Sequence, residues 1–137
     1  MTPQQIKLVK DSFALVLPIS DDAAELFYKK LFELNPGYKS LFKGDMVEQG
    51  KKLMKMIATA VNSLDKLEEV VPAIQNLGKR HVEYGIKKED YAVVGEALIW
   101  TLEKGLGDKF TDDVKESWID VYTILSDTMI NAAEEAA

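Results

Sequence analysis

Apolar residues recur at steps of three and four along nearly the whole chain, and this spacing restricts the fold to one built from helices. Such steps place the apolar side chains on one face of an α-helix. No stretch alternates apolar and polar residues over the length of a strand, and no segment repeats at a fixed period. The pattern therefore predicts an all-α protein with six or seven helices and short linkers, and we expect residues 1–137 to form one domain.

Capping residues, glycines and prolines predict where the helices begin and end. Thr2, Pro3 and Gln5 have the arrangement of a capping box with proline in the first turn. The other expected signals are a start at Ser20-Asp21-Asp22, a break at Asn35-Pro36-Gly37, a short turn from Tyr38 to Phe42, a loop at Lys43-Gly44-Asp45, a start near Val47, a restart at Pro72, a break from Gly85 to Glu89, an end at Gly105 and Gly107, and a cap at Thr111.

Composition excludes several classes of protein. The absence of cysteine rules out disulfides, thiolate metal sites, thiol catalysis and covalently attached haem. A net charge of −6 and a pI near 4.8 argue against nucleic acid or an anionic membrane as the main partner. No apolar run is long enough to span a membrane, and no signal peptide is recognisable, so we expect a cytoplasmic protein.

His81 is the only histidine among 137 residues, and it lies on an apolar helix face. It continues a stripe of apolar residues with helical spacing, formed by Leu67, Val70, Ile74 and Leu77. The spacing leaves two interpretations open. His81 is either a core histidine satisfied by a backbone carbonyl, or a ligand of a metal or haem, because neutral imidazole is the commonest protein ligand.

Two more polar residues lie at positions that do not suit a simple apolar core. Tyr28 borders the apolar stripe of the second expected helix, and Gln49 shares a helix face with Leu53, Met56 and Ala60. A buried hydroxyl or amide needs a hydrogen-bond partner. Both residues therefore either lie at a solvent-wetted boundary or face a site that supplies such a partner.

Five short motifs occur in one order along the chain. They are Phe27-Tyr28 with Asn35-Pro36, Leu41-Phe42, Gln49-Gly50 with Leu53, Leu77-Gly78 with His81, and Asp90-Tyr91 with Gly95. Each is weak alone, but together the chain resembles the bacterial single-domain haemoglobins and the globin half of flavohaemoglobins. The resemblance extends from Thr2 to about Met129 and implies a globin fold with its helices around a haem pocket.

On the proximal side, the resemblance implies that His81 is the iron ligand of a non-covalently bound haem b. Its other ring nitrogen would be held by a backbone carbonyl near Leu77. In the relatives a tyrosine and a glutamate make this histidine more basic; Tyr91 matches the tyrosine, but the glutamate position falls on Ala133. Glu134 lies one residue further, about 100° around a helix. This departure weakens the expectation of peroxidase-like or dedicated dioxygenase chemistry.

On the distal side, the resemblance implies that Phe42 packs on the porphyrin face. Tyr28 and Gln49 match the pair whose hydroxyl and amide donate hydrogen bonds to bound dioxygen, and Leu53 matches the apolar residue that limits access to the iron. The connector between Phe42 and Gln49 is several residues shorter than in close relatives. Because His81 is the only histidine, coordination of one iron by two histidines of the same chain is excluded.

Three functions follow from these expectations. The first is reversible binding of dioxygen for carriage, storage or delivery, with nitric oxide and carbon monoxide as further diatomic ligands. The second is nitric oxide dioxygenase activity, in which Tyr28 and Gln49 position dioxygen and a separate reductase restores ferrous iron, since we expect no flavin or nicotinamide domain in the chain. The third is a haem-free sensor or interaction module that uses exposed aromatics such as Trp100 and Tyr38. Both a monomer and a homodimer are compatible with the sequence.

Overall fold

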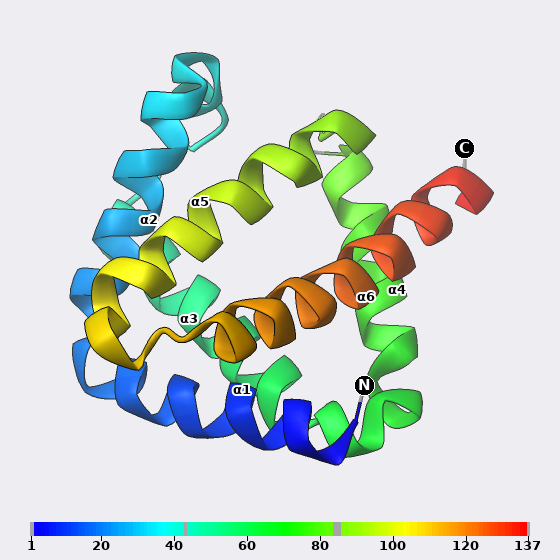
Figure 1. Ribbon diagram of the computed structural model, residues 1–137. Helices are drawn as coiled ribbons and strands as arrows, with labels where there is room; N and C mark the ends of the chain where they lie inside the picture. The colour runs from blue at the N-terminus through cyan, green and yellow to red at the C-terminus, as the bar shows by residue number, and fades with distance from the viewer. Residues whose placement is uncertain (1, 43, 84–85, 137) are drawn as a thin grey trace.

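Six α-helices make up most of the computed structural model, which describes residues 2–42, 44–83 and 86–136 (Figure 1). They are α1 (Pro3–Val16), α2 (Ser20–Leu34), α3 (Met46–Asn62), α4 (Leu67–Glu83), α5 (Lys88–Leu106) and α6 (Asp112–Ala136). The short 3₁₀ segments are η1 (Leu17–Ile19), η2 (Pro36–Leu41), η3 (Leu64–Lys66) and η4 (Gly107–Lys109). The described ranges contain no strand, so the all-α prediction is confirmed. In the same ranges no helix is long and apolar enough to cross a lipid bilayer.

Local sequence accounts for several helix ends. The Thr2 hydroxyl accepts a hydrogen bond from the Gln5 backbone N–H at 3.1 Å, and the Gln5 side chain accepts one from the Thr2 N–H at 3.0 Å. This is the predicted capping box. Thr111 caps α6 as predicted, through a 3.3 Å hydrogen bond from the Val114 N–H. Gly107 ends α5 with φ of 56°, a conformation that favours glycine.

One predicted cap and one predicted helix start are wrong. The helix α2 begins at Ser20 as predicted, with Asp21 and Asp22 in its first turn, but Ser20 does not cap it, because the chain enters through η1 and Ser20 already has helical dihedrals. Pro72 does not restart a helix; it lies inside α4, which begins five residues earlier at Leu67. Proline cannot donate to the carbonyl four residues before it, here that of Glu68. Because Glu68 is exposed in the first turn, water can satisfy that carbonyl, and the helix tolerates the proline.

Two further predictions concern glycines. Gly105 was expected to help end α5 but lies within the helix, which continues to Leu106. The predicted break from Gly85 to Glu89 falls partly outside the described residues, since the structure describes neither residue 84 nor residue 85. Within the described part, α5 begins at Lys88.

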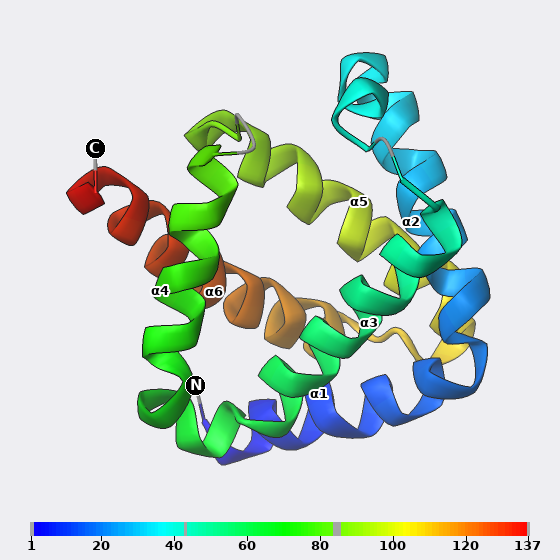
Figure 2. The same ribbon diagram turned by 180° about the vertical axis from the view of Figure 1, so that it is seen from behind.

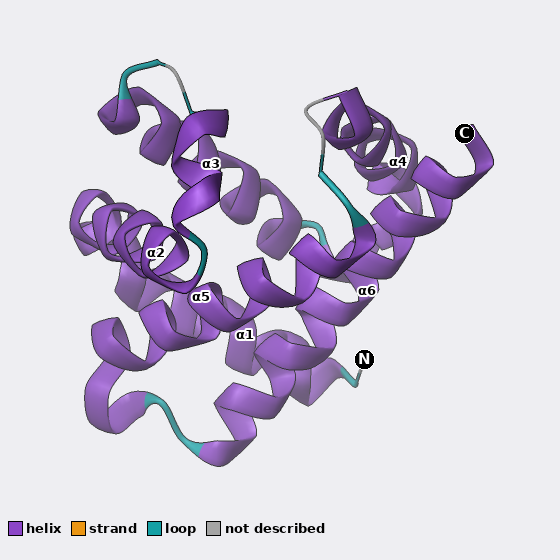
Figure 3. Cartoon of the chain, turned by 90° about the horizontal axis from the view of Figure 1, so that it is seen from above, coloured by secondary structure: helices purple, strands orange, loops and turns teal. Residues whose placement is uncertain are grey.

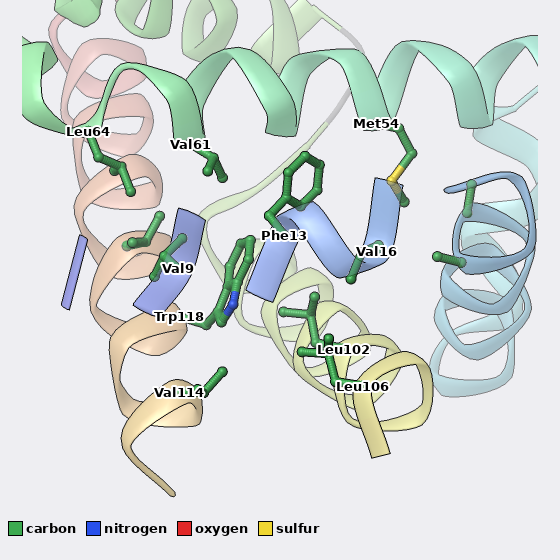
Figure 4. Close-up of a cluster of buried hydrophobic side chains, with 13 residues drawn as sticks. Val9, Phe13, Val16, Met54, Val61, Leu64, Leu102, Leu106, Val114 and Trp118 are labelled. Atoms are coloured by element: carbon green, nitrogen blue, oxygen red, sulfur yellow. The ribbon is translucent and has the colours of Figure 1, made fainter. Parts of the chain in front are cut away.

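The larger hydrophobic core lies where α1, α3, α5 and α6 meet (Figure 4). Trp118 at its centre is 1% exposed, and its indole N–H donates to the Ser12 hydroxyl at 2.9 Å. The ring of Phe13 packs 6.1 Å from that of Trp118. Residues of α1 and α6 that are far apart in sequence therefore form one packed unit.

A second core, which we term the aromatic cluster, joins α2, η2 and α5. Its buried members are Phe27, Tyr28, Leu31, Tyr38 and Ala97, with Phe32 and Phe42 packed against them. Edge-to-face and tilted ring pairs of this kind add roughly 0.5–1.5 kcal/mol each beyond the area they bury. This cluster fixes the position of Tyr28 and of the segment that follows η2.

The packing of α4 differs from that of the other helices. Figures 2 and 3 show α4 beside α6, on the opposite side of the molecule from α2 and α3. Of the described side-chain positions of α4, Gly78 alone is buried. A Cβ atom on Gly78 would lie 2.4 Å from the carbonyl oxygen of Met129. The absence of a side chain at Gly78 is therefore what allows α4 to approach α6 so closely.

Candidate functional site

The imidazole of His81 has a defined orientation. Its Nδ1 lies 2.7 Å from the carbonyl oxygen of Leu77, one helical turn earlier, so the hydrogen bond expected near Leu77 is present. Because a carbonyl can only accept, Nδ1 carries the proton, and in the neutral imidazole Nε2 then carries the lone pair. This tautomer and this backbone contact are those of a histidine that binds a metal through Nε2. They also satisfy a core histidine, so the bond alone does not decide between the two interpretations.

Tyr91 is the aromatic residue beside this imidazole. The two ring centroids are 6.2 Å apart, with an angle of 32° between the planes. The backbone carbonyl of Tyr91 accepts a hydrogen bond from the Tyr122 hydroxyl at 2.5 Å. Gly95 makes room for Tyr122, because a Cβ atom there would lie 2.7 Å from the Tyr122 ring. Two helices, α5 and α6, thus hold Tyr91 in place.

Sequence reasoning missed Tyr122. The available signal was its position one turn after Trp118, next to the apolar stripe of the last helix.

A second position on α6 that bears on His81 is that of the glutamate expected from the family resemblance. Glu134 is exposed and Ala133 is partly buried. The exposed carboxylate of Glu134 therefore faces solvent rather than the Tyr91–His81 pair.

Tyr28 lies inside the aromatic cluster rather than at a wetted boundary. Its side chain is 7% exposed, and its ring centroid lies 5.0 Å from that of Phe27 and 5.2 Å from that of Phe42. Burial raises the pKa of the Tyr28 hydroxyl, and a side-chain hydrogen bond with Gln49 partly opposes that rise. The structure therefore brings Tyr28, Phe42 and Gln49 together, although Gln49 itself remains partly exposed.

Leu53 completes this second group of residues. It follows Gln49 by one turn of α3, is partly buried, and packs against both hydrophobic clusters. The candidate residues thus fall into two groups. A distal group, comprising Tyr28, Phe42, Gln49 and Leu53, comes from α2, the end of η2 and α3. A proximal group, comprising Leu77, His81 and Tyr91, comes from α4 and the start of α5. In Figure 2, α3 and α4 face each other across the molecule.

The prediction that Tyr38 is an exposed aromatic is wrong. The 3₁₀ segment η2 turns its ring into the aromatic cluster, where it is 8% exposed. Its hydroxyl donates to Asp90 Oδ1 at 2.5 Å. Burial, the hydrogen bond to Asp90 and the charge of that carboxylate raise the pKa of Tyr38 to about 12, against a smaller opposing effect of Asn35.

The other aromatic that was expected to be exposed, Trp100, is partly exposed. The ammonium groups of Lys30 and Lys104 lie 5.1 and 5.8 Å from its ring centre.

From the burial of four tyrosines we predict that the folded protein loses stability at high pH. Burial raises the pKa values of Tyr28, Tyr38, Tyr91 and Tyr122 in the folded state. A raised folded pKa means that the folded state holds the proton more tightly, so this stability is complete below the unfolded value of about 10. It is lost as the pH rises above about 10 and through the folded value. Tyrosinate absorbance should therefore appear together with loss of helical circular dichroism above about pH 10. Gradual ionisation with the helices intact would contradict this.

A separate groove of about 690 Å³ lies between α5 and α6. Tyr91, Gly95, Trp100 and Tyr122 contribute to its walls. None of the distal group lines it, and neither does His81. We therefore place the candidate site at the distal and proximal groups rather than in this groove.

The surface near His81 suits a flat, largely apolar cofactor. The apolar residues of α4 that lead to His81, namely Val70, Ile74 and Leu77, are only partly buried. Met56 on the Leu53 face of α3 is 39% exposed, and Val82 is 47% exposed. Among the described residues there is no group of three or more histidine, cysteine or carboxylate side chains that could hold a metal ion. One oriented imidazole with apolar surroundings fits a metal that arrives within an organic ring, as in haem.

Comparison with known proteins gives consistent results. A family model described as Globin matches residues 25–129. The flavohemoprotein of Oceanobacillus iheyensis is 30% identical over 132 residues, which are 94% of this chain but 32% of that protein. This chain therefore spans about a third of the flavohemoprotein. Neuroglobin-1 of Oncorhynchus mykiss is 31% identical over 114 residues, covering 73% of this chain and 72% of its own length.

Solved structures show the same fold. A bacterial globin from Campylobacter jejuni superposes with a TM-score of 0.86 at 25% identity, covering 98% of both chains. An engineered carbene transferase from Rhodothermus marinus superposes with a TM-score of 0.88 at 23% identity, covering 99% of this chain and 95% of its own. The second likeness bears on the fold alone.

Proposed function

The chain belongs to the globin family, and from this premise we propose that it is a haem b protein that binds dioxygen reversibly at a five-coordinate ferrous iron. The observation that carries the proposal is the burial of Tyr28, which is 7% exposed and packs against Phe42 in the aromatic cluster, with Gln49 of α3 nearby. Tyr28 and Gln49 belong to α2 and α3, which lie across the molecule from α4, the helix that bears the oriented imidazole of His81. A buried hydroxyl beside an amide provides two hydrogen-bond donors for a small polar ligand.

Each group of residues has a distinct task in this proposal. His81 Nε2 holds the iron, and the Leu77 carbonyl orients the ring and raises its basicity. Phe42 and Leu53 provide apolar walls that exclude water from the distal side. When bound, ferrous haem supplies the centre at which dioxygen binds and acquires partial negative charge.

Tyr28 and Gln49 act on that charge. Hydrogen-bond donors held ready in a place without water stabilise developing negative charge more than the same donors would in water. They therefore favour dioxygen over carbon monoxide, which remains nearly neutral. They also slow the release of dioxygen.

Removing the Tyr28 hydroxyl tests this proposal. A hydrogen bond to a charged partner contributes about 1.5–3 kcal/mol, so the Tyr28→Phe variant should release dioxygen roughly 10- to 100-fold faster. Flash photolysis or stopped-flow mixing measures this rate, and carbon monoxide release should change far less. The Ser12→Ala variant removes a buried hydroxyl from the other core and should leave the rate unchanged. Equal rates in Tyr28→Phe and the unmodified protein would overturn the proposed donor role.

A second candidate is nitric oxide dioxygenase activity with a separate reductase. The same Tyr28–Gln49 pair favours it, because it would position dioxygen for reaction with nitric oxide to give nitrate. The exposed position of Glu134 favours oxygen binding instead, since no carboxylate from that position reaches the Tyr91–His81 pair. Catalytic nitrate formation in a reductase-coupled assay would support the enzyme. Oxidation that stops after one turnover, at ferric iron, would favour the carrier.

A further inference from the structure

In addition to the apolar contacts that α5 makes with the aromatic cluster, a hydrogen bond connects this cluster to the start of α5. The Tyr38 hydroxyl donates to Asp90 Oδ1 at 2.5 Å, across 52 residues of sequence. Tyr38 is buried among the side chains that also surround Tyr28. Asp90 lies in the first turn of α5 and directly precedes Tyr91. The bond therefore joins a segment on the distal side to a segment on the proximal side.

The two carboxylate oxygens of Asp90 have different partners. Oδ1 accepts from Tyr38, while Oδ2 accepts from the backbone N–H of Lys87 at 2.7 Å, just before the helix begins. Asp90 thus holds the start of α5 and contacts Tyr38 at the same time. A hydrogen bond to an ionised acceptor is shorter and stronger than one between neutral groups. Asparagine would replace one of these two accepting oxygens with an NH₂ donor, so it could not make both contacts in this geometry.

The segments that this bond joins lead directly to candidate site residues. On one side, Phe42 follows η2 immediately, and its ring lies 5.2 Å from that of Tyr28. On the other side, Tyr91 lies 6.2 Å from the imidazole of His81. A change in the separation of Tyr38 and Asp90 would therefore shift Phe42 relative to Tyr91.

We propose that Tyr38 and Asp90 are positioning residues whose hydrogen bond sets the distance between the distal aromatic cluster and the Tyr91–His81 pair. This distance determines the width of the space in which a cofactor ligated by His81 lies. The inference rests on the proposed function, because the width matters only if haem binds there. Tyr38 and Asp90 need not contact the haem themselves.

The first test uses the protein without haem. The Tyr38→Phe variant removes the bond to Asp90 but leaves the Asp90–Lys87 contact in place. It should speed amide hydrogen exchange both in η2 and at residues 90–94 of α5, and it should lower the urea midpoint. In the Asp90→Ala background, the same tyrosine change should leave the midpoint unchanged or raise it, because the bond is already absent. An equal drop in both backgrounds, or faster exchange in η2 alone, would overturn the inference.

The second test uses the haem-loaded protein. The Tyr38→Phe variant should shift the iron–histidine stretching band of the ferrous form and change the rate of dioxygen release several-fold. The Ser12→Ala variant, which loses a buried hydrogen bond in the other core, should do neither. Unchanged spectra in Tyr38→Phe would overturn the positioning role while leaving the proposed function intact. Failure of the unmodified protein to bind haem would instead overturn the proposed function, and the exchange experiment would still decide whether the bond couples the two segments.

Discussion

Replacing Gly78 with alanine is expected to displace α4 from α6 and to weaken haem binding together with stability. A Cβ atom at this position would lie 2.4 Å from the oxygen and 2.7 Å from the Cα of Met129. Both atoms belong to the backbone, so no side-chain rotation can relieve the clash and one helix must move. Inserting atoms into a packed contact of this kind costs about 1–3 kcal/mol and occasionally more. His81 is three residues further along the same helix and would move with it.

A second glycine provides a matched control. Gly105 also lies inside a helix, but a Cβ atom there meets only the Cδ1 of Ile19, at an ordinary 3.5 Å. The Gly105→Ala variant should therefore be unchanged or more stable by up to about 1 kcal/mol, since alanine favours helix. Urea unfolding and haem titration of both variants measure these effects. If Gly78→Ala matched the unmodified protein in both, close contact between α4 and α6 would not be what holds His81 in place.

Replacing His81 with alanine is expected to abolish ligation of the haem iron. The chain contains no other histidine and no cysteine, so it offers no equivalent nitrogen or thiolate ligand. Loss of an outer-shell partner alone costs metal sites about 10- to 100-fold in affinity, and loss of the ligand itself should cost more. Haem titration followed by absorption spectroscopy measures the change. Added imidazole should restore a nitrogen-ligated spectrum, because it can occupy the space that the side chain left.

The same variant separates the two interpretations of His81. A core histidine would contribute to stability without haem, so its removal would lower the urea midpoint of the haem-free protein. A ligand would contribute mainly when haem is bound. Because His81 is only partly buried, we expect the haem-free midpoint to change little. A haem spectrum that is unchanged in His81→Ala would show that another group holds the iron.

Features that depend on neighbouring residues were predictable from the sequence. The capping box at Thr2 and Gln5 uses atoms three residues apart, so its chemistry is complete within the local sequence. The hydrogen bond from His81 to the carbonyl of Leu77 likewise spans one helical turn. The proximity of Tyr28 and Gln49 was different. Helical spacing placed each residue on a face, but only the resemblance to a known family indicated that the two faces meet.

Features that depend on distant segments were not predictable in this way. The orientation of Tyr38 is set by η2, whose 3₁₀ turns do not follow the 3.6-residue spacing used to assign faces. The partner of its hydroxyl, Asp90, comes from another helix. Gly78 stood out in the sequence within a motif, yet the reason that it must be glycine lies in the backbone of Met129. In each case the sequence does not show which helix packs against the residue in question.

The contact between Ser12 and Trp118 has a consequence for how the protein is made. These residues are 106 positions apart, and Trp118 is the largest fully buried side chain of the described residues. While a ribosome is still producing α5, the first helix exists without the indole that will cover Phe13. Its apolar face must remain uncovered, or be held by a chaperone, until α6 emerges. Folding of this domain therefore awaits the synthesis of α6, although Val9 and Phe13 of α1 are among its most deeply buried residues.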